Sequence, residues 1–158
     1  MSAKKWLTLL PLLAVLIAIF CFSAQSAEQS AATSGKVMEV VLDTVVPEFE
    51  QMEPVKQQTI RETASHLVRK AAHLTEFGAL GFFLLLHLRQ WKGSGVVWLW
   101  TWLAGTLYAV SDEVHQCFVA GRGPGAVDVC IDSAGVLCGI AMALLLCVIV
   151  KKIRNKRA

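Results

Sequence analysis

The chain has 158 residues, of which 55% are hydrophobic and 17% are charged, and its formal net charge at pH 7 is +3. Soluble domains carry about 25% charged residues, and the mean hydropathy here is +0.55. This composition excludes a typical soluble domain, a disordered chain, a collagen-like fibre and a nucleic-acid-binding arm. It predicts a membrane protein with one domain and no nucleic-acid partner.

Four apolar segments are long enough, or nearly so, to cross about 30 Å of hydrocarbon as helices of roughly 20 residues. They lie near residues 6–22, 71–88, 93–111 and 127–150. The first segment also resembles a secretory signal peptide that would be cleaved after Ala27, but its apolar run is long for one, so we interpret it as a retained helix. The predicted fold is an all-α membrane protein with a four-transmembrane-helix bundle.

The distribution of Lys and Arg predicts the orientation of these spans, because basic residues accumulate on the cytoplasmic side. The connection 112–126 has a single basic residue, Arg122, so we expect it to lie outside together with the long connection 23–70. Both termini are then cytoplasmic. The basic residues at the predicted cytoplasmic ends are Lys4, Lys5, Arg89, Lys92 and those of the tail 151–158.

The outer segment 36–70 has apolar residues at helical spacing in two runs, separated by Pro47 and Pro54. This pattern predicts one or two amphipathic helices on the outer surface, the second of which runs into the span at 71–88.

Five cysteines are present, and none forms a C-x-x-C pair. Cys117 and Cys130 lie in one polar region and could pair on an oxidising side, although we favour unpaired thiols for all five.

Polar residues from distant parts of the sequence fall at one end of the predicted bundle. Because ionisable groups within spans are costly and face the bundle interior or a wet cavity, we expect a partly buried outer pocket. The residues concerned are Ser23, Gln25, Arg69, Lys70, His73, Glu76, Ser111, Asp112, Glu113, His115, Gln116, Arg122, Asp128 and Asp132.

The spacing of some of these residues predicts how they are presented. His66, Arg69, His73 and Glu76 share one helical face. Asp128 and Asp132 continue into the G-x-x-x-G run at 135–139, which lets another helix approach closely, so the acids are expected to point at that helix. The Gly-rich loop 120–125 predicts a sharp turn that presents Arg122 or backbone N–H groups to an anion.

Four blocks of residues resemble the VanZ-like family of bacterial membrane proteins and occur in the order found in that family. The second and third of these blocks are the ones specific to the family. The four blocks are Phe22-Ser23-x-Gln25, residues 69–78 (RKAAHLTEFG), residues 111–119 (SDEVHQCFV) and the set Gly121, Arg122, Asp128, Val129, Asp132 and Gly135.

The resemblance implies a single VanZ-like membrane domain over residues 1–158, located in the bacterial inner (cytoplasmic) membrane. It also implies a link to low-level resistance to the glycopeptide teicoplanin, but no established reaction. The polar positions of the family fall on residues of the predicted outer pocket, without assigned roles.

Our first functional hypothesis is binding of an anionic lipid or a lipid-linked cell-wall precursor through its headgroup, with membrane lipids as partners. Guanidinium groups match phosphate bidentately, so Arg69, Arg122 and also Lys70 are expected to hold it. The candidate ligand-binding residues are Ser23, Gln25, Arg69, Lys70, Gln116 and Arg122.

The alternative is a phosphoester hydrolase or transferase, with a divalent metal as a possible cofactor. The candidate catalytic residues are His73, Glu76, Asp112, Glu113, His115, Asp128 and Asp132, and the candidate metal ligands are His73, Glu76, His115 and Asp128. No specific metal motif such as H-E-x-x-H is present. A third interpretation is structural: a self-satisfied polar network that fixes the helices of a protein acting through membrane partners.

Overall fold

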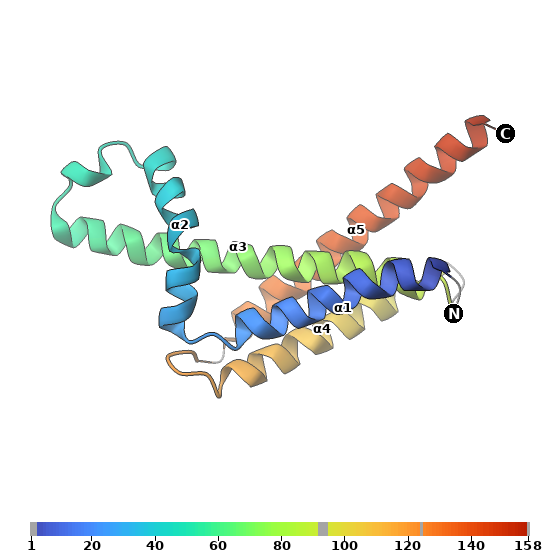
Figure 1. Ribbon diagram of the computed structural model, residues 1–158, viewed down its shortest axis with the longest axis horizontal. Coiled ribbons are helices and arrows are strands. Elements are labelled where there is room, and N and C mark those ends of the chain that lie inside the picture. Colours follow the sequence, from blue (N-terminus) through green and yellow to red (C-terminus); the bar gives the residue numbers. More distant parts are fainter. Residues whose placement is uncertain (1–2, 92–94, 124, 158) are drawn as a thin grey trace.

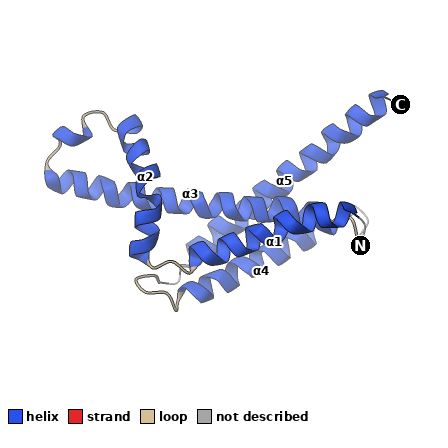
Figure 2. Ribbon diagram, viewed as in Figure 1, coloured by secondary structure: helices blue, strands red, loops and turns tan. Residues whose placement is uncertain are grey.

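The computed structural model describes residues 3–91, 95–123 and 125–157, and every regular element in them is helical (Figures 1 and 2). The all-α prediction is therefore confirmed, with no strand in the described ranges. The elements are α1 (Ala3–Ser23), α2 (Ala27–Val45), the short 3₁₀ helix η1 (Phe49–Gln51), α3 (Pro54–Leu88), α4 (Val97–Gln116) and α5 (Ala126–Arg157).

Helix α3 is the central element and packs against the other four α-helices. Pro54 occupies its first turn, where the missing N–H costs nothing. Its 35 residues correspond to about 52 Å, which exceeds the thickness of the hydrocarbon core. The predicted second amphipathic run and the span at 71–88 are thus one continuous helix, and its N-terminal part projects beyond α1 and α4 (Figure 1).

The close packing of α3 and α5 depends on glycine. A Cβ at Gly139 would overlap the carbonyl oxygen of Gly78, and one at Gly135 would come within 2.6 Å of the carbonyl oxygen of Leu74. The G-x-x-x-G run of α5 therefore faces a neighbouring helix, as predicted, and that helix is α3. Asp132 lies on the same buried face of α5.

Helix α2 leaves the bundle and runs across α3 (Figure 1). Ser26 caps it by a reciprocal capping box with Gln29. An ion pair of 2.8 Å between Glu39 and Arg61 joins it to α3. Helices thus cover most of the segment 36–70, while their position at a membrane surface stays a prediction.

Among the described residues, three helices are long and apolar enough to cross a membrane: α1 over Lys5–Ser23, α3 and α5. Large apolar side chains are exposed along their length, for example Ile17 and Val148, as expected for surfaces that contact lipid. Helix α4 is not among the three, because its tryptophans and the pair Asp112–Glu113 lower its hydropathy. The fourth span stays a prediction.

Some of the predicted features lie outside the described residues, namely Lys92, the start of the predicted span at 93–94, Pro124 and the terminal Ala158. Cys117 and Cys130, for which we considered pairing, are both exposed free thiols.

Candidate functional site

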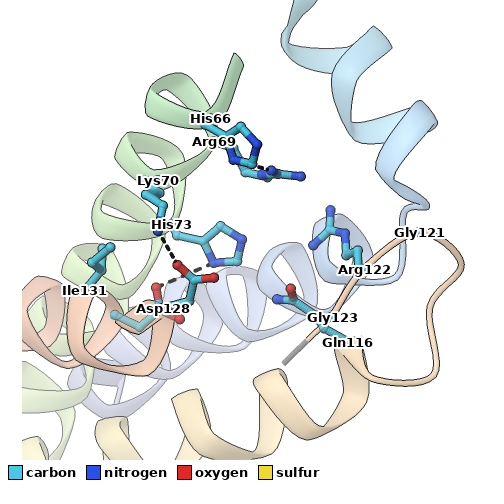
Figure 3. Close-up of a pocket in the computed structure, with 11 residues that line it drawn as sticks. His66, Arg69, Lys70, His73, Gln116, Gly121, Arg122, Gly123, Asp128 and Ile131 are labelled. Carbon is cyan, nitrogen blue, oxygen red and sulfur yellow. Dashed lines mark hydrogen bonds and ion pairs between the residues drawn. The ribbon is translucent and has the colours of Figure 1, made fainter. Parts of the chain in front are cut away.

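A polar cavity of about 280 Å³ opens at the end of the bundle where α1 and α4 end and α5 begins (Figure 3). Four side chains of α3 form one wall, and Arg122 and Gln116 lie on the opposite side (Figure 3). The lining residues are His66, Arg69, Lys70, His73, Gln116, Gly121, Arg122, Gly123, Asp128, Ile131 and Asp132.

The two acids of α5 engage the α3 wall of this cavity. Lys70 Nζ lies 2.6 Å from Asp128 Oδ1, in an ion pair whose side chains are 39% and 43% exposed. One turn deeper, His73 Nδ1 lies 3.5 Å from Asp132 Oδ1, and Asp132 is fully buried. The predicted direction of the acids towards a neighbouring helix is thus observed, and the partners are Lys70 and His73.

The two arginines of the cavity differ from Lys70 in their partners. Among the residues that the structure describes, neither Arg69 nor Arg122 forms an ion pair with a carboxylate. Arg69 Nη2 lies 2.9 Å from Nδ1 of His66, and its guanidinium points across the cavity towards Arg122 (Figure 3). Two cations therefore face the same space, and neither is paired directly with a carboxylate of the described residues.

Arg122 is held by the loop between α4 and α5. Gly121 adopts a positive φ of 74°, which L side chains rarely tolerate, and the N–H of Ala27 donates to the carbonyl of Ala120 (3.2 Å). The guanidinium donates from Nη2 to the carbonyl oxygen of Phe22 at 3.4 Å. Its Nε and Nη1 are buried and have no hydrogen-bond partner within the described part of the chain.

Burial lowers the pKa of the Arg122 guanidinium, and the charge of Arg69 lowers this pKa further. The carboxylates of Asp112 and Glu113 act in the opposite direction. Arginine nevertheless stays protonated in proteins, so the cost of burial falls on a permanent cation. A bound anion would relieve that cost and satisfy the free N–H groups.

Below the cavity, Asp112 links the end of α1 to the end of α4. Ser23 of α1 donates to its Oδ2 at 2.7 Å, and Gln116, one turn on in α4, donates to the same atom at 2.9 Å. Asp112, Ser23 and Gln116 are all buried. The adjacent Glu113 accepts a hydrogen bond from the backbone N–H of Gly125 and so holds the end of the α4–α5 loop.

An apolar groove of about 560 Å³ adjoins the cavity between α2 and α3. Val37 and Val41 of α2 and Val68 of α3 contribute to its walls. Three residues belong to both spaces, namely Arg69, His73 and Arg122. These three basic residues therefore lie at the boundary between the polar cavity and the apolar groove.

The cavity and its supporting contacts contain residues of all four sequence blocks that carry the resemblance. A family model described as VanZ/LLP1 matches residues 8–148 of the chain. The chain belongs to the VanZ/LLP1 family. No curated protein and no solved structure matches it.

The VanZ/LLP1 match includes every residue that we predicted for the outer pocket, and the structure sorts them by location. Gln25 and Glu76 line the apolar groove rather than the cavity. Ser23, Asp112 and Glu113 lie in the supporting contacts described above. The predicted residues that line the cavity are Arg69, Lys70, His73, Gln116, Arg122, Asp128 and Asp132.

His115 is not among the residues that line either space. Its ring stacks on Phe20 of α1 with centroids 4.8 Å apart. Within the described ranges, the group able to hold a metal ion comprises His73, Asp112 and Asp132. Our other metal candidates, Glu76, His115 and Asp128, lie outside this group.

The sequence analysis did not assign Ile131 or Phe20 to this region, whereas it placed Gly123 in the loop that presents Arg122. Ile131 precedes Asp132 in the apolar run of α5, so nothing in the sequence distinguishes it from a lipid-facing residue. His66 was detectable, because it shares a helical face with Arg69 and His73.

Proposed function

We propose that this protein binds the phosphate-bearing headgroup of an anionic lipid or a lipid-linked cell-wall precursor in the cavity at the end of the bundle. The observation that carries the proposal is the guanidinium of Arg122, whose buried Nε and Nη1 lack partners in the described residues. Buried polar groups are normally satisfied, and a guanidinium fork matches two oxygens of a phosphate. Arg69, which faces the same cavity, supplies a second guanidinium.

The adjoining groove favours a lipid over a free phosphate ion. An amphiphile would place its phosphate between Arg69 and Arg122 and its apolar chain against Val37, Val41 and Val68. Burial of each methylene group contributes about 0.8 kcal/mol, so a long chain adds affinity that inorganic phosphate lacks.

In this proposal the protein resides in the bacterial inner membrane, with both termini in the cytoplasm and the cavity at the outer surface. By holding a headgroup there, it changes how cell-wall precursors are displayed to glycopeptides and so lowers susceptibility to teicoplanin. The family membership and the three candidate spans support the membrane location.

The test is lipid binding to the full-length protein, measured by native mass spectrometry from detergent micelles. The probes are phosphatidylglycerol, a polyprenyl phosphate and phosphatidylcholine, with inorganic phosphate as a competitor. Arg122→Gln is compared with Arg154→Gln, which removes the same charge from the exposed end of α5.

We expect one or both anionic probes to bind the wild-type protein and Arg154→Gln, and to bind Arg122→Gln at least about tenfold more weakly. Preference for polyprenyl phosphate would identify a cell-wall precursor, and preference for phosphatidylglycerol a phospholipid. If millimolar inorganic phosphate displaces both lipids completely, the groove does not contribute. Equal binding by Arg122→Gln and Arg154→Gln would overturn the proposal.

A further inference from the structure

Three helices each contribute one potential metal ligand to a single point at the floor of the cavity. His73 comes from α3, Asp112 from α4 and Asp132 from α5. One ligand atom of each lies within 4.8 Å of the other two. These residues are far apart in the sequence, and the helix packing alone brings them together.

Two of the ligand atoms lack a hydrogen-bond partner. Asp132 is 1% exposed, and its Oδ1 accepts no hydrogen bond from any described residue. Nδ1 of His73 is likewise buried and unsatisfied. An unsatisfied carboxylate oxygen is costly in a buried position, so this pair points to a missing partner.

The distance between these two atoms suits a shared metal ion. At 3.5 Å, His73 Nδ1 and Asp132 Oδ1 are far apart for a charge-assisted hydrogen bond, which is about 2.7–2.9 Å long. Two ligands of a tetrahedral zinc ion, each about 2.1 Å from the metal, lie about 3.4 Å apart.

A protonated His73 could instead form an ion pair with Asp132, but this pairing leaves Asp112 out. Asp112 brings a second buried carboxylate to the same point, so with neutral His73 the three groups carry two negative charges. A divalent cation balances that charge.

Asp112 is also held as metal ligands usually are. The hydroxyl of Ser23 and the amide of Gln116 both donate to its Oδ2, which fixes the orientation of the carboxylate. Hydrogen bonds to metal-binding carboxylates from outside the coordination sphere are typical of metal sites.

We propose that His73, Asp112 and Asp132 bind one divalent transition-metal ion, such as Zn²⁺. One imidazole nitrogen with two carboxylate oxygens suits zinc better than Ca²⁺ or Mg²⁺, which prefer oxygen alone. His73 and Asp132 line the cavity, so an ion that they held would be reached from its interior. This site does not depend on the headgroup proposal.

The test measures zinc in the purified full-length protein without a histidine tag. The protein is stripped with a chelator, reloaded with Zn²⁺ and freed of excess metal by gel filtration, and zinc per chain is determined by mass spectrometry. Asp132→Asn removes one ligand while conserving its shape. Asp128→Asn is the matched control, because Asp128 lies one turn away and pairs with Lys70.

We expect one zinc ion per chain in the wild-type protein and in Asp128→Asn. Loss of a ligand should weaken zinc binding about 100-fold or more in Asp132→Asn, since even neighbours of the ligands contribute 10–100-fold. The proposal is overturned if the wild-type protein retains no zinc, or if Asp132→Asn retains as much as Asp128→Asn.

X-ray absorption at the zinc edge of the wild-type protein provides a test that requires no variant to fold. We expect one histidine ligand, with all other ligands being oxygen atoms. Any sulfur ligand would overturn the assignment. Arg122→Gln separates the two proposals, because it should retain zinc while losing the anionic lipid. Zinc retained without lipid binding in the wild-type protein would overturn the headgroup proposal alone.

Discussion

The hydroxyl of Ser23 donates a hydrogen bond of 2.7 Å to Oδ2 of Asp112, although the two residues are 89 positions apart in the sequence. Both side chains are buried, so this bond joins the end of α1 to the end of α4 beneath the cavity. The cavity wall is therefore fixed by contacts between helix ends as well as by the packing of α3 and α5.

Ser23→Ala should lower the free energy of unfolding by about 1–2 kcal/mol, because Asp112 loses one of its donors in a buried position. The measurement is denaturant unfolding of the protein in detergent micelles. Ser111→Ala is the control, since Ser111 is exposed and its hydroxyl donates to the backbone carbonyl of Tyr108 in the same helix. Equal stability of the two variants would show that the Ser23–Asp112 bond contributes nothing.

Gly139→Ala should destabilise the protein by about 1–3 kcal/mol or more, because the new Cβ overlaps the carbonyl oxygen of Gly78 and separates α3 from α5. Gly35→Ala is the matched control. Its Cβ meets nothing within 4 Å, and alanine in a helix is up to about 1 kcal/mol more favourable than glycine. In the same unfolding assay, the free energy of unfolding should fall in Gly139→Ala and rise in Gly35→Ala. An unchanged free energy of unfolding in Gly139→Ala would contradict the close approach of α3 and α5.

The predicted orientation can be tested at Cys117, an exposed thiol immediately after α4. In a variant that retains this cysteine alone, a membrane-impermeant maleimide should label intact spheroplasts. A second variant with Asn155→Cys as its single cysteine, in the tail of α5, should react only after permeabilisation. The reverse labelling pattern would place the cavity on the cytoplasmic side.

Much of the fold follows from residue patterns that act locally. Long apolar runs indicated the helices of the bundle, and apolar periodicity indicated those of the segment 36–70. The G-x-x-x-G spacing at 135–139 indicated the face of α5 that packs closely. Gly78 and Gly81 in α3 are the complementary small residues, and their short spacing was a usable signal for the partner helix.

The remaining features depend on how the helices are rotated against one another, which a single sequence does not determine. His115 shares its helix with Asp112 and Gln116, yet it turns towards Phe20 and away from the cavity. The sequence also could not show that Lys70 pairs with Asp128 while Arg69 and Arg122 form no ion pair with an acid in the described part of the chain. That difference arises only when α3, α5 and the α4–α5 loop are placed together.

In the proposed function, Arg69 and Arg122 hold one anion between them. The most direct measurement is a double-mutant cycle on the dissociation constant of the anionic lipid, using wild-type protein, Arg69→Gln, Arg122→Gln and the double variant. Each single substitution should weaken binding about tenfold or more.

If both guanidinium groups contact the same phosphate, their contributions to the free energy of lipid binding should not be additive. The loss in the double variant should then differ from the sum of the two single losses, in either direction, by about 0.5–3 kcal/mol. Additive effects would show that the arginines act on separate ligands. Unchanged binding in either single variant would contradict the shared site.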